Sequence, residues 1–182
     1  MLINTSTDVV LLEKNEAIEQ LAQSLGFSKV FFLGQDFVHP SGEKKIALLQ
    51  DMKKAQQRKL LSVYKASDPE TLRFVLEKTP VDMVYGLEQL YERDSFHYPK
   101  SGLDHILCKI AAERGKTIAF SFSELLNARE KAVLLRRMAF NIRLCTKYKV
   151  KMFFGSFAQR KEEMRSRKDL ETFFRLLEKM RF

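Results

Sequence analysis

The chain has 182 residues, of which 45% are hydrophobic and 30% charged, a composition typical of a soluble globular protein. It is most simply a single domain over residues 1–182, long enough to bury a substantial core. No apolar run is long enough to cross a bilayer, and the first residues lack the basic-then-apolar order of a signal peptide. We therefore expect a cytoplasmic protein without a membrane partner, whose two cysteines, Cys108 and Cys145, are buried thiols.

Net charge is the most informative bulk property. The chain has 32 Lys and Arg residues against 23 Asp and Glu, which gives +9 at pH 7. Such an excess favours a polyanionic partner, because each basic group that meets a nucleic-acid phosphate releases a condensed counterion. The alternative is a surface charged only for solubility. The basic residues are unevenly placed along the chain, which favours the polyanion.

Hydrophobic periodicity predicts strands and helices that alternate in chain order. The expected strands cover residues 9–12 (or 1–3 in their place), 29–33, 60–64, 81–85, 117–122 and 150–154. The expected helices cover residues 15–25, 43–57, a segment that opens at 67–70, 103–114, 129–149 and 168–180. In the helix 103–114, the residues expected to face the core are Leu103, Ile106, Leu107 and Ile110.

Alternation of this kind requires parallel strands joined by right-handed crossovers. Six strands can be counted, whereas a full eight-stranded barrel usually takes roughly 250 residues. The pattern alone therefore predicts either an α/β layer fold or an abbreviated barrel. The connection 86–102 is rich in charged and aromatic residues, and its length indicates a functional or mobile loop.

The sequence contains none of the common catalytic motifs. There is no glycine-rich phosphate loop, no serine nucleophile elbow and no paired cysteine motif. His39, His97 and His105 are isolated, without the spacing of a metal-binding pair. We expect no catalytic residue and no metal or cofactor bound by the protein. Ligands that converge from distant positions leave a metallohydrolase open as an alternative.

The predicted helix 129–149 carries a basic stripe opposite its core face. At 100° per residue, the stripe consists of Arg129, Arg136, Phe140, Arg143 and Lys147. The opposite, inward face consists of Leu134, Leu135, Met138, Ile142 and Cys145. A solvated helix surface is one interpretation. RNA binding is the other, because the stripe has no acidic residue to relieve the repulsion between its charges, and an exposed Phe140 suits a stacking platform or a partner contact.

A second group of basic residues follows the last predicted strand. Five of them lie within nine positions: Arg160, Lys161, Arg165, Arg167 and Lys168. In a barrel this is the rim where ligands bind, and arginine suits backbone phosphates through its bidentate geometry. Asp169 belongs either to this site or to the cap of the last helix. Asp104 and His105 similarly open a helix, either as helix-end groups or as a surface shared with RNA or a partner chain.

Several short motifs follow one another between residues 101 and 170. They are Ser-Gly-Leu-Asp-His-Ile-Leu-Cys-Lys (101–109), Thr-Ile-Ala-Phe-Ser-Phe-Ser-Glu-Leu-Leu (117–126), Leu-Leu-Arg-Arg-Met (134–138), Gly-Ser-Phe-Ala-Gln (155–159) and Met-Arg-Ser-Arg-Lys-Asp-Leu (164–170). In order and spacing they resemble ribonuclease P protein component 3, an archaeal and eukaryal subunit whose barrel is related to the PHP (polymerase and histidinol phosphatase) superfamily. The family motif matches Asp104, His105, Lys109 and Asp169, and the basic loop of the family supports Arg165.

The resemblance implies a TIM-barrel-like α/β fold, shortened at its carboxyl end, in a subunit that helps a catalytic RNA remove the 5′ leader of precursor tRNA. The RNA and its Mg²⁺ ions would then do the chemistry. The implied partners are the ribonuclease P RNA, precursor tRNA and a small α/β protein subunit, in a paired complex for which a heterotetramer is one form. The residues assigned to the protein contact are Tyr91, Phe96, Tyr98 and Phe140. Two alternatives are a stand-alone PHP-like metal-dependent phosphoesterase and a general RNA-binding scaffold.

Overall fold

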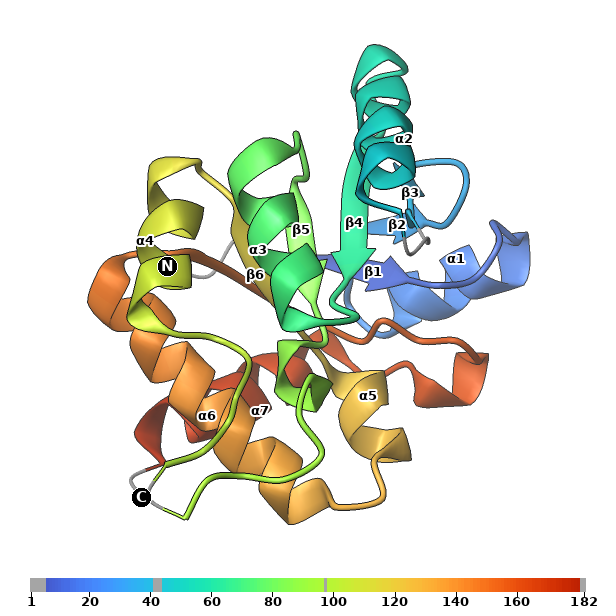
Figure 1. Cartoon of the computed structure of the whole chain (residues 1–182). Coiled ribbons are helices and arrows are strands. Elements are labelled where there is room, and N and C mark those ends of the chain that lie inside the picture. Colours follow the sequence, from blue (N-terminus) through green and yellow to red (C-terminus); the bar gives the residue numbers. More distant parts are fainter. Residues whose placement is uncertain (1–5, 41–43, 97, 181–182) are drawn as a thin grey trace.

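Parallel strands alternate with helices along the chain, as predicted (Figure 1). The computed structural model describes residues 6–40, 44–96 and 98–180, so the alternative first strand at 1–3 and His97 lie outside the described residues. The strands are β1 (Thr7–Val10), β2 (Lys29–Phe32), β3 (Phe37–Val38), β4 (Leu61–Lys65), β5 (Met83–Tyr85), β6 (Thr117–Ser121) and β7 (Lys151–Gly155). The helices are α1 (Glu16–Ser24), α2 (Lys45–Gln57), α3 (Pro69–Lys78), α4 (His105–Glu113), α5 (Phe122–Asn127), α6 (Lys131–Tyr148) and α7 (Arg167–Lys179), with 3-10 turns η1 (Leu87–Gln89) and η2 (Lys161–Glu163).

Capping side chains explain where several helices begin. The Asn15 side chain accepts a hydrogen bond from the Ala17 N–H at the start of α1, and Asp68 accepts from the Thr71 N–H at the start of α3. Ser121, the last residue of β6, caps α5 by accepting from the Glu124 N–H. The periodicity missed α5 and the two-residue β3, because both are too short to show a repeating pattern.

The strands form a five-stranded sheet, ordered β3-β4-β5-β6-β7, and a two-stranded sheet of β1 and β2, all parallel. Single parallel bridges join the two sheets, from Val10 to Ala158 and from Leu33 to Phe37. The Phe157 N–H also donates to the Val9 carbonyl at 2.9 Å. Between the described strands these contacts are isolated bridges and not full ladders. The arrangement is therefore barrel-like but not a closed barrel.

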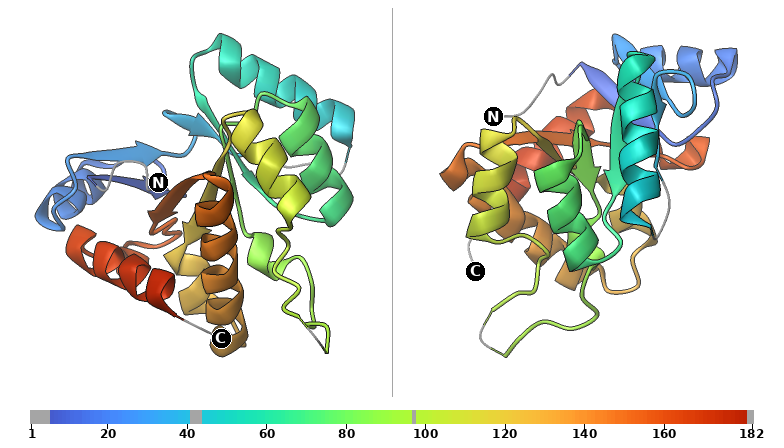
Figure 2. Two further views of the ribbon diagram at one scale, coloured as in Figure 1. Left: turned by 90° about the vertical axis from the view of Figure 1, so that its left-hand side faces the viewer. Right: turned by 45° about the horizontal axis from the view of Figure 1, so that its top comes forward.

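The two sheets share one interior, and the helices cover their outer side (Figure 2). The interior core takes side chains from both sheets: Val9, Phe37, Val63, Tyr85, Ala119, Phe153 and Phe157. Because side chains alternate across a strand, the neighbouring residues point outward and pack beneath the helices, as Ile118 and Phe154 do. Side chains thus fill the centre of the strand ring, as in a small barrel.

A buried carboxylate holds β1 against the chain that follows β7. The Asp8 carboxylate accepts hydrogen bonds from the N–H of Ser156 at 2.7 Å and from its hydroxyl at 2.5 Å. Burial raises the pKa of Asp8 to about 6, although these hydrogen bonds oppose the shift. A side chain at Gly155 would place its Cβ 2.5 Å from the Phe153 ring and 3.0 Å from Asp8, so only glycine fits the approach. This contact gives the Gly155-Ser156 motif a structural role.

The first turn of α4 differs from the expectation. Ile106 was predicted to face the core, but it is 45% exposed. The helix begins at His105, and its buried residues are Leu107, Cys108 and Ala111. Cys108 and Cys145 are buried free thiols, as predicted. Among the described residues, no helix is both long and apolar enough to span a membrane.

Candidate nucleic-acid interface

Helix α6 carries most of the predicted basic stripe, but it begins at Lys131, so Arg129 lies in the connection before it and not on the helix. Its buried face contains Leu134, Met138, Ile142 and Cys145, as predicted, and Leu135 is half-buried. The structure also buries Arg137 and Asn141 on this helix, which the periodicity did not indicate. A polar side chain can occupy a buried helix face only if its donors are satisfied, so these two residues need partners in another part of the fold.

Arg137 binds the loop 86–102. Its Nη1 donates to the carbonyls of Glu88 at 2.8 Å and Tyr91 at 2.6 Å, and its Nε donates to Asp94 at 2.8 Å. Arg137 is only 4% exposed, and its Nη2 donates to no acceptor among the described residues. The loop was expected to be functional or mobile, and this side chain binds its first part, from Glu88 to Asp94, to α6.

Asn141 fastens both ends of the same loop. Its Nδ2 donates to the Glu88 carboxyl and to the Ser101 carbonyl, each at 2.9 Å. Burial raises the pKa of Glu88 to about 7, against the lowering effect of the hydrogen bond from Asn141. Gly102 closes the loop with a φ of +79°, where a Cβ would fall 2.1 Å from the Leu87 carbonyl oxygen. The loop is therefore closed on itself by backbone geometry as well as by α6.

One part of the prediction about the stripe is wrong. Arg136 was expected to repel its neighbours without relief, but it forms an ion pair with Asp94, which also pairs with Arg137. Burial opposes ionisation of Asp94, but hydrogen bonds from Arg137, the Lys100 N–H and Arg136 outweigh it and lower its pKa. Asp94 lies 42 positions before Arg136, so no local spacing could indicate the pair.

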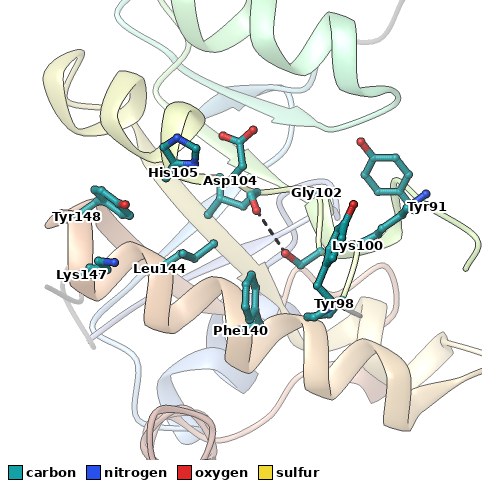
Figure 3. Close-up of a pocket in the computed structure, with 13 residues that line it drawn as sticks. Tyr91, Tyr98, Lys100, Gly102, Asp104, His105, Phe140, Leu144, Lys147 and Tyr148 are labelled. Carbon is teal, nitrogen blue, oxygen red and sulfur yellow. Dashed lines mark hydrogen bonds between the residues drawn. The ribbon is translucent and has the colours of Figure 1, made fainter. Parts of the chain in front are cut away.

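An aromatic cavity of about 580 Å³ lies between the loop, the start of α4 and the outer side of α6 (Figure 3). Its aromatic walls are Tyr91, Tyr98, Phe140 and Tyr148. Phe140 is half-buried in this wall, which corrects the expectation that it is exposed. We call this hollow the aromatic cavity. It brings together Tyr91, Tyr98 and Phe140, three of the four residues predicted to contact a partner, and the fourth, Phe96, is 96% exposed in the same loop.

Cations lie over the rings of the aromatic cavity. The Lys100 ammonium is 5.5 Å from the Tyr91 ring, and the Lys147 ammonium is 5.5 Å from the Tyr148 ring. The Arg143 guanidinium is 5.7 Å from the Phe140 ring. Positive charge interleaved with aromatic faces suits an unpaired nucleotide, whose base stacks while its phosphate meets a cation. Lys100 and Tyr148 were not identified from the sequence.

Asp104 and His105 lie at the edge of the aromatic cavity (Figure 3). Asp104 caps α4 by accepting from the Leu107 N–H at 2.8 Å, so the helix-end interpretation is confirmed for its carboxylate. His105 is the first residue of α4 and is exposed. Lys109, the remaining motif residue of this helix, is also exposed.

The second basic group is organised by a buried carboxylate. Glu163 accepts from the Ser123 hydroxyl at 2.6 Å, the Gln159 N–H at 2.9 Å and the Arg160 guanidinium at 2.9 Å. Burial opposes ionisation of Glu163, but the hydrogen bonds outweigh it and lower its pKa to about 2. Arg160 is thus already paired, whereas Lys161 is exposed and takes part in no ion pair with a described residue. The sequence did not indicate Glu163 or Ser123.

The arginines next to η2 are also engaged locally. Arg165 donates to the carbonyls of Glu162 and Met164, each at 2.8 Å, and Arg167 pairs with Glu171 at 3.2 Å. Lys168 is exposed.

Asp169 does not cap the last helix, which corrects one of its two interpretations. The cap of α7 is Ser166, whose hydroxyl accepts from the Asp169 N–H at 3.1 Å.

The two basic groups lie apart. Phe140 and Lys147 of the stripe line the aromatic cavity together with residues of the loop 86–102. Arg129 and Arg136 line a neighbouring hollow, and Tyr91 lines both. In Figure 1, residues 160–168 lie on the side of α5 that faces away from α6.

The carboxyl ends of the strands are filled by side chains. His39 Nε2 lies 2.9 Å from the Tyr85 hydroxyl, and the Tyr85 ring stacks on Phe157 at 4.6 Å. Lys65 pairs with Glu124 at 2.7 Å beside them. Burial and the nearby Lys65 lower the pKa of His39. Among the described residues, no three histidine, cysteine or carboxylate side chains are close enough together to hold a metal ion.

Comparison with known proteins gives two kinds of likeness, although no protein-family model matches the chain. Over 71 residues it is 45% identical to ribonuclease P protein component 3 of Thermococcus gammatolerans. The chain resembles ribonuclease P protein component 3. The protein of that name from Thermococcus kodakarensis is 44% identical over 71 residues. Each match covers 38% of this chain, and it spans only 33% and 32% of the two relatives' lengths.

The likeness in three dimensions is more extensive. A chain in a cryo-EM structure of archaeal ribonuclease P with mature tRNA superposes with a TM-score of 0.66, at 20% identity. The superposition covers 95% of this chain and 74% of the other. At that identity the match shows the fold alone. The α/β arrangement of parallel strands and helices is therefore the one found in a chain of that particle.

Proposed function

We propose that this chain is a protein subunit of ribonuclease P that helps a catalytic RNA remove the 5′ leader from precursor tRNA. The observation that carries the proposal is the 45% identity to ribonuclease P protein component 3 over 71 residues. The fold shared over 95% of the chain is consistent with it. The net charge of +9 suits a protein that lies against RNA.

In this proposal the protein's part is electrostatic. Phosphates that crowd together in a folded RNA repel one another, and basic side chains reduce the amount of Mg²⁺ that the RNA needs to stay folded. Arg129, Arg143 and Lys147 are the best-placed cations of the stripe, because all three are exposed and none forms an ion pair with a described residue, whereas Arg136 pairs with Asp94. The Mg²⁺ is assigned to the RNA, and no cofactor is assigned to the protein.

We assign the exposed part of the loop 86–102 to a small α/β protein subunit. Phe96 and Tyr98 are 96% and 60% exposed, although the loop that carries them is fixed by Arg137 and Asn141. Aromatic side chains have few rotatable bonds and lose little entropy on binding, which suits a stable protein contact. The rest of the aromatic cavity, lined by Tyr91, Phe140 and Tyr148, is assigned to the RNA.

Cleavage of precursor tRNA tests the function. The matching RNA and small subunit should cleave at modest Mg²⁺ only when this chain is present. A chain that makes no difference, but hydrolyses a phosphoester alone when metal is added, would establish the phosphoesterase instead. A chain that binds structured RNAs without preference for the ribonuclease P RNA, and leaves cleavage unchanged, would be a general scaffold.

Co-purification tests the protein contact separately. Alanine at both Phe96 and Tyr98 should weaken pairing with the small subunit, as measured by size-exclusion chromatography of the mixture. Leu176→Ala is the matched control, because Leu176 is a large exposed apolar residue on a different element, α7. Pairing that survives the double variant unchanged would place the small subunit on another surface.

A further inference from the structure

A second cavity, of about 500 Å³, opens where the strands begin, at the end of the barrel opposite His39 and Tyr85. Its apolar wall consists of Val9, Phe31, Phe37, Val63, Met83 and Phe153, most of which belong to the interior core. We call it the strand-start cavity. It shares no residue with the aromatic cavity or with the basic group at 160–168.

Two lysines face into this cavity from strand positions that a barrel usually fills with apolar side chains. Lys29 is the first residue of β2, and Lys151 is the first residue of β7. Each stands two positions before a phenylalanine of the interior, Phe31 or Phe153. Because side chains two residues apart share one face of a strand, both lysines point to the same side as these rings.

Strand order places the lysines close to hydroxyl groups. Thr7 is paired in register with Lys29, and Thr117 is paired in register with Lys151. Since β1 lies beside β7, the order around the cavity is Lys29, Thr7, Lys151, Thr117. Two lysines and two threonines thus alternate across four neighbouring strands at the mouth of the cavity. Ammonium and hydroxyl groups both bind phosphate oxygens.

The remaining charges add to the positive potential. Arg114 and Lys116 also line the strand-start cavity, and the acidic residue of its lining is Asp82. The Asp82 carboxylate accepts from the Ser62 N–H at 2.8 Å and hydroxyl at 3.0 Å, and its charge acts on Lys116. No described carboxylate forms an ion pair with Lys29 or Lys151, and the Lys29 ammonium instead lies 4.4 Å from the Phe31 ring.

We infer that the strand-start cavity binds a nucleotide, with its phosphate on Lys29 and Lys151 and its base against the apolar wall. A phosphate alone would not need an apolar hollow, and an uncharged apolar ligand would not need lysines at inward strand positions. Phe31 and Phe153 supply ring faces for a base, and the volume is that of a small-molecule site. The identity of the occupant as an unpaired nucleotide of RNA rests on the proposed function.

Methionine methyl signals test the inference on the isolated chain of residues 1–182. With ¹³C-methyl-methionine, NMR should show the Met83 signal shift on addition of adenosine monophosphate, because Met83 lines the cavity. Met52 and Met138 are buried under helices and should not move. Adenosine and inorganic phosphate, each tested alone, should bind at least about tenfold more weakly than the nucleotide.

Paired substitutions identify the groups responsible. Lys29→Gln with Lys151→Gln should raise the Kd for adenosine monophosphate at least about tenfold. Lys131→Gln with Lys179→Gln removes the same charge from exposed helix positions and should leave the Kd unchanged. All four lysines are exposed, so both double variants should keep the core intact. An unchanged Met52 signal in each variant checks this.

Three results would overturn the inference: no shift of Met83, equal affinity for phosphate and nucleotide, or tighter binding of octanoate than of the nucleotide. The second would indicate a plain anion site, and the third a site for an anionic amphiphile. Precursor-tRNA cleavage separates this inference from the proposed function. If the chain supports cleavage but fails these titrations, the proposed function stands and the nucleotide site is rejected. If the chain binds the nucleotide but does not support cleavage, the site stands and the proposed function is rejected.

Discussion

Asp94 and Arg137 join the loop 86–102 to helix α6 through a hydrogen-bonded ion pair of 2.8 Å. The arginine is buried and the carboxylate is mostly buried, so the pair is largely removed from water. The same guanidinium also satisfies two loop carbonyls. One side chain therefore sets the position of the segment that forms a wall of the aromatic cavity.

Substitution of Arg137 should destabilise the protein far more than substitution of its neighbour. Arg137→Met leaves two carbonyls without their donor and removes one of the three donors to Asp94, which should lower the free energy of unfolding by about 3 kcal/mol. Arg136→Met removes a pair whose arginine side chain is 44% exposed, and should cost less than about 1 kcal/mol. Urea unfolding measures both changes, and equal losses would contradict the role given to Arg137.

RNA affinity should depend on which cations of the stripe are free. Arg143→Gln and Lys147→Gln should each weaken binding and lower the salt dependence of the binding constant by about one unit of slope. Arg136→Gln should have a smaller effect, because Asp94 already offsets its charge. Lys53→Gln, at an exposed position on α2, is the control. Binding measured between low and moderate salt gives the slopes, and equal slopes for all four variants would argue against the stripe as an RNA surface.

Glu88 should make the protein less stable as the pH rises from about 4.5 to about 7. Its pKa is about 7 in the folded chain against a usual value of 4.5, so the folded state holds the proton more tightly than the unfolded state. The resulting stabilisation is fully present below the usual pKa and is lost as the pH passes the folded value. Glu88→Gln should remove this part of the slope and raise stability at pH 8 by at least about 1 kcal/mol, as measured by urea unfolding across pH. Asp8 contributes a similar slope at lower pH and remains in the variant.

Glu163 should act in the opposite sense. Its pKa is about 2 in the folded chain against a usual value of 4.5, so its contribution is present above the usual pKa and is lost as the pH falls toward 2. Glu163→Gln should destabilise the protein by roughly 1–3 kcal/mol at pH 7 and by less at pH 2. Hydrogen exchange of the Gln159 N–H, which donates to this carboxylate, should rise in the variant. An unchanged exchange rate would mean that the loop is held by other contacts.

Periodicity predicted the alternating elements because most strands and helices present one apolar face. It failed at Arg137 and Asn141, since polar residues at buried helix positions look like part of the solvated side until their partners are known. Those partners lie 40 to 53 positions away, which no local pattern reaches. The sequence placed Arg136, Arg143 and Lys147 on one side of a helix, and all three lie on α6. Arg129 lies before the helix, and the pairing of Arg136 depends on the fold of the loop.

Motif resemblance marked Asp104 and His105, and the structure places both at the edge of the aromatic cavity. The strand-start cavity had no counterpart in the sequence analysis. A lysine at the beginning of a strand is unremarkable by itself, and Lys29 and Lys151 converge only because β1 lies between their strands. The visible signal, once the register is known, is a lysine two positions before an inward phenylalanine on both β2 and β7.

The contact between Asp8 and Ser156 spans 148 positions of sequence. On a ribosome, β1 and β2 are made well before the backbone that β1 binds, around Ala158. During that interval Asp8 has no Ser156 to bind, and one edge of β1 stays unpaired. Assembly of the strand ring should therefore be a late event and, because such distant contacts close slowly, the rate-limiting one.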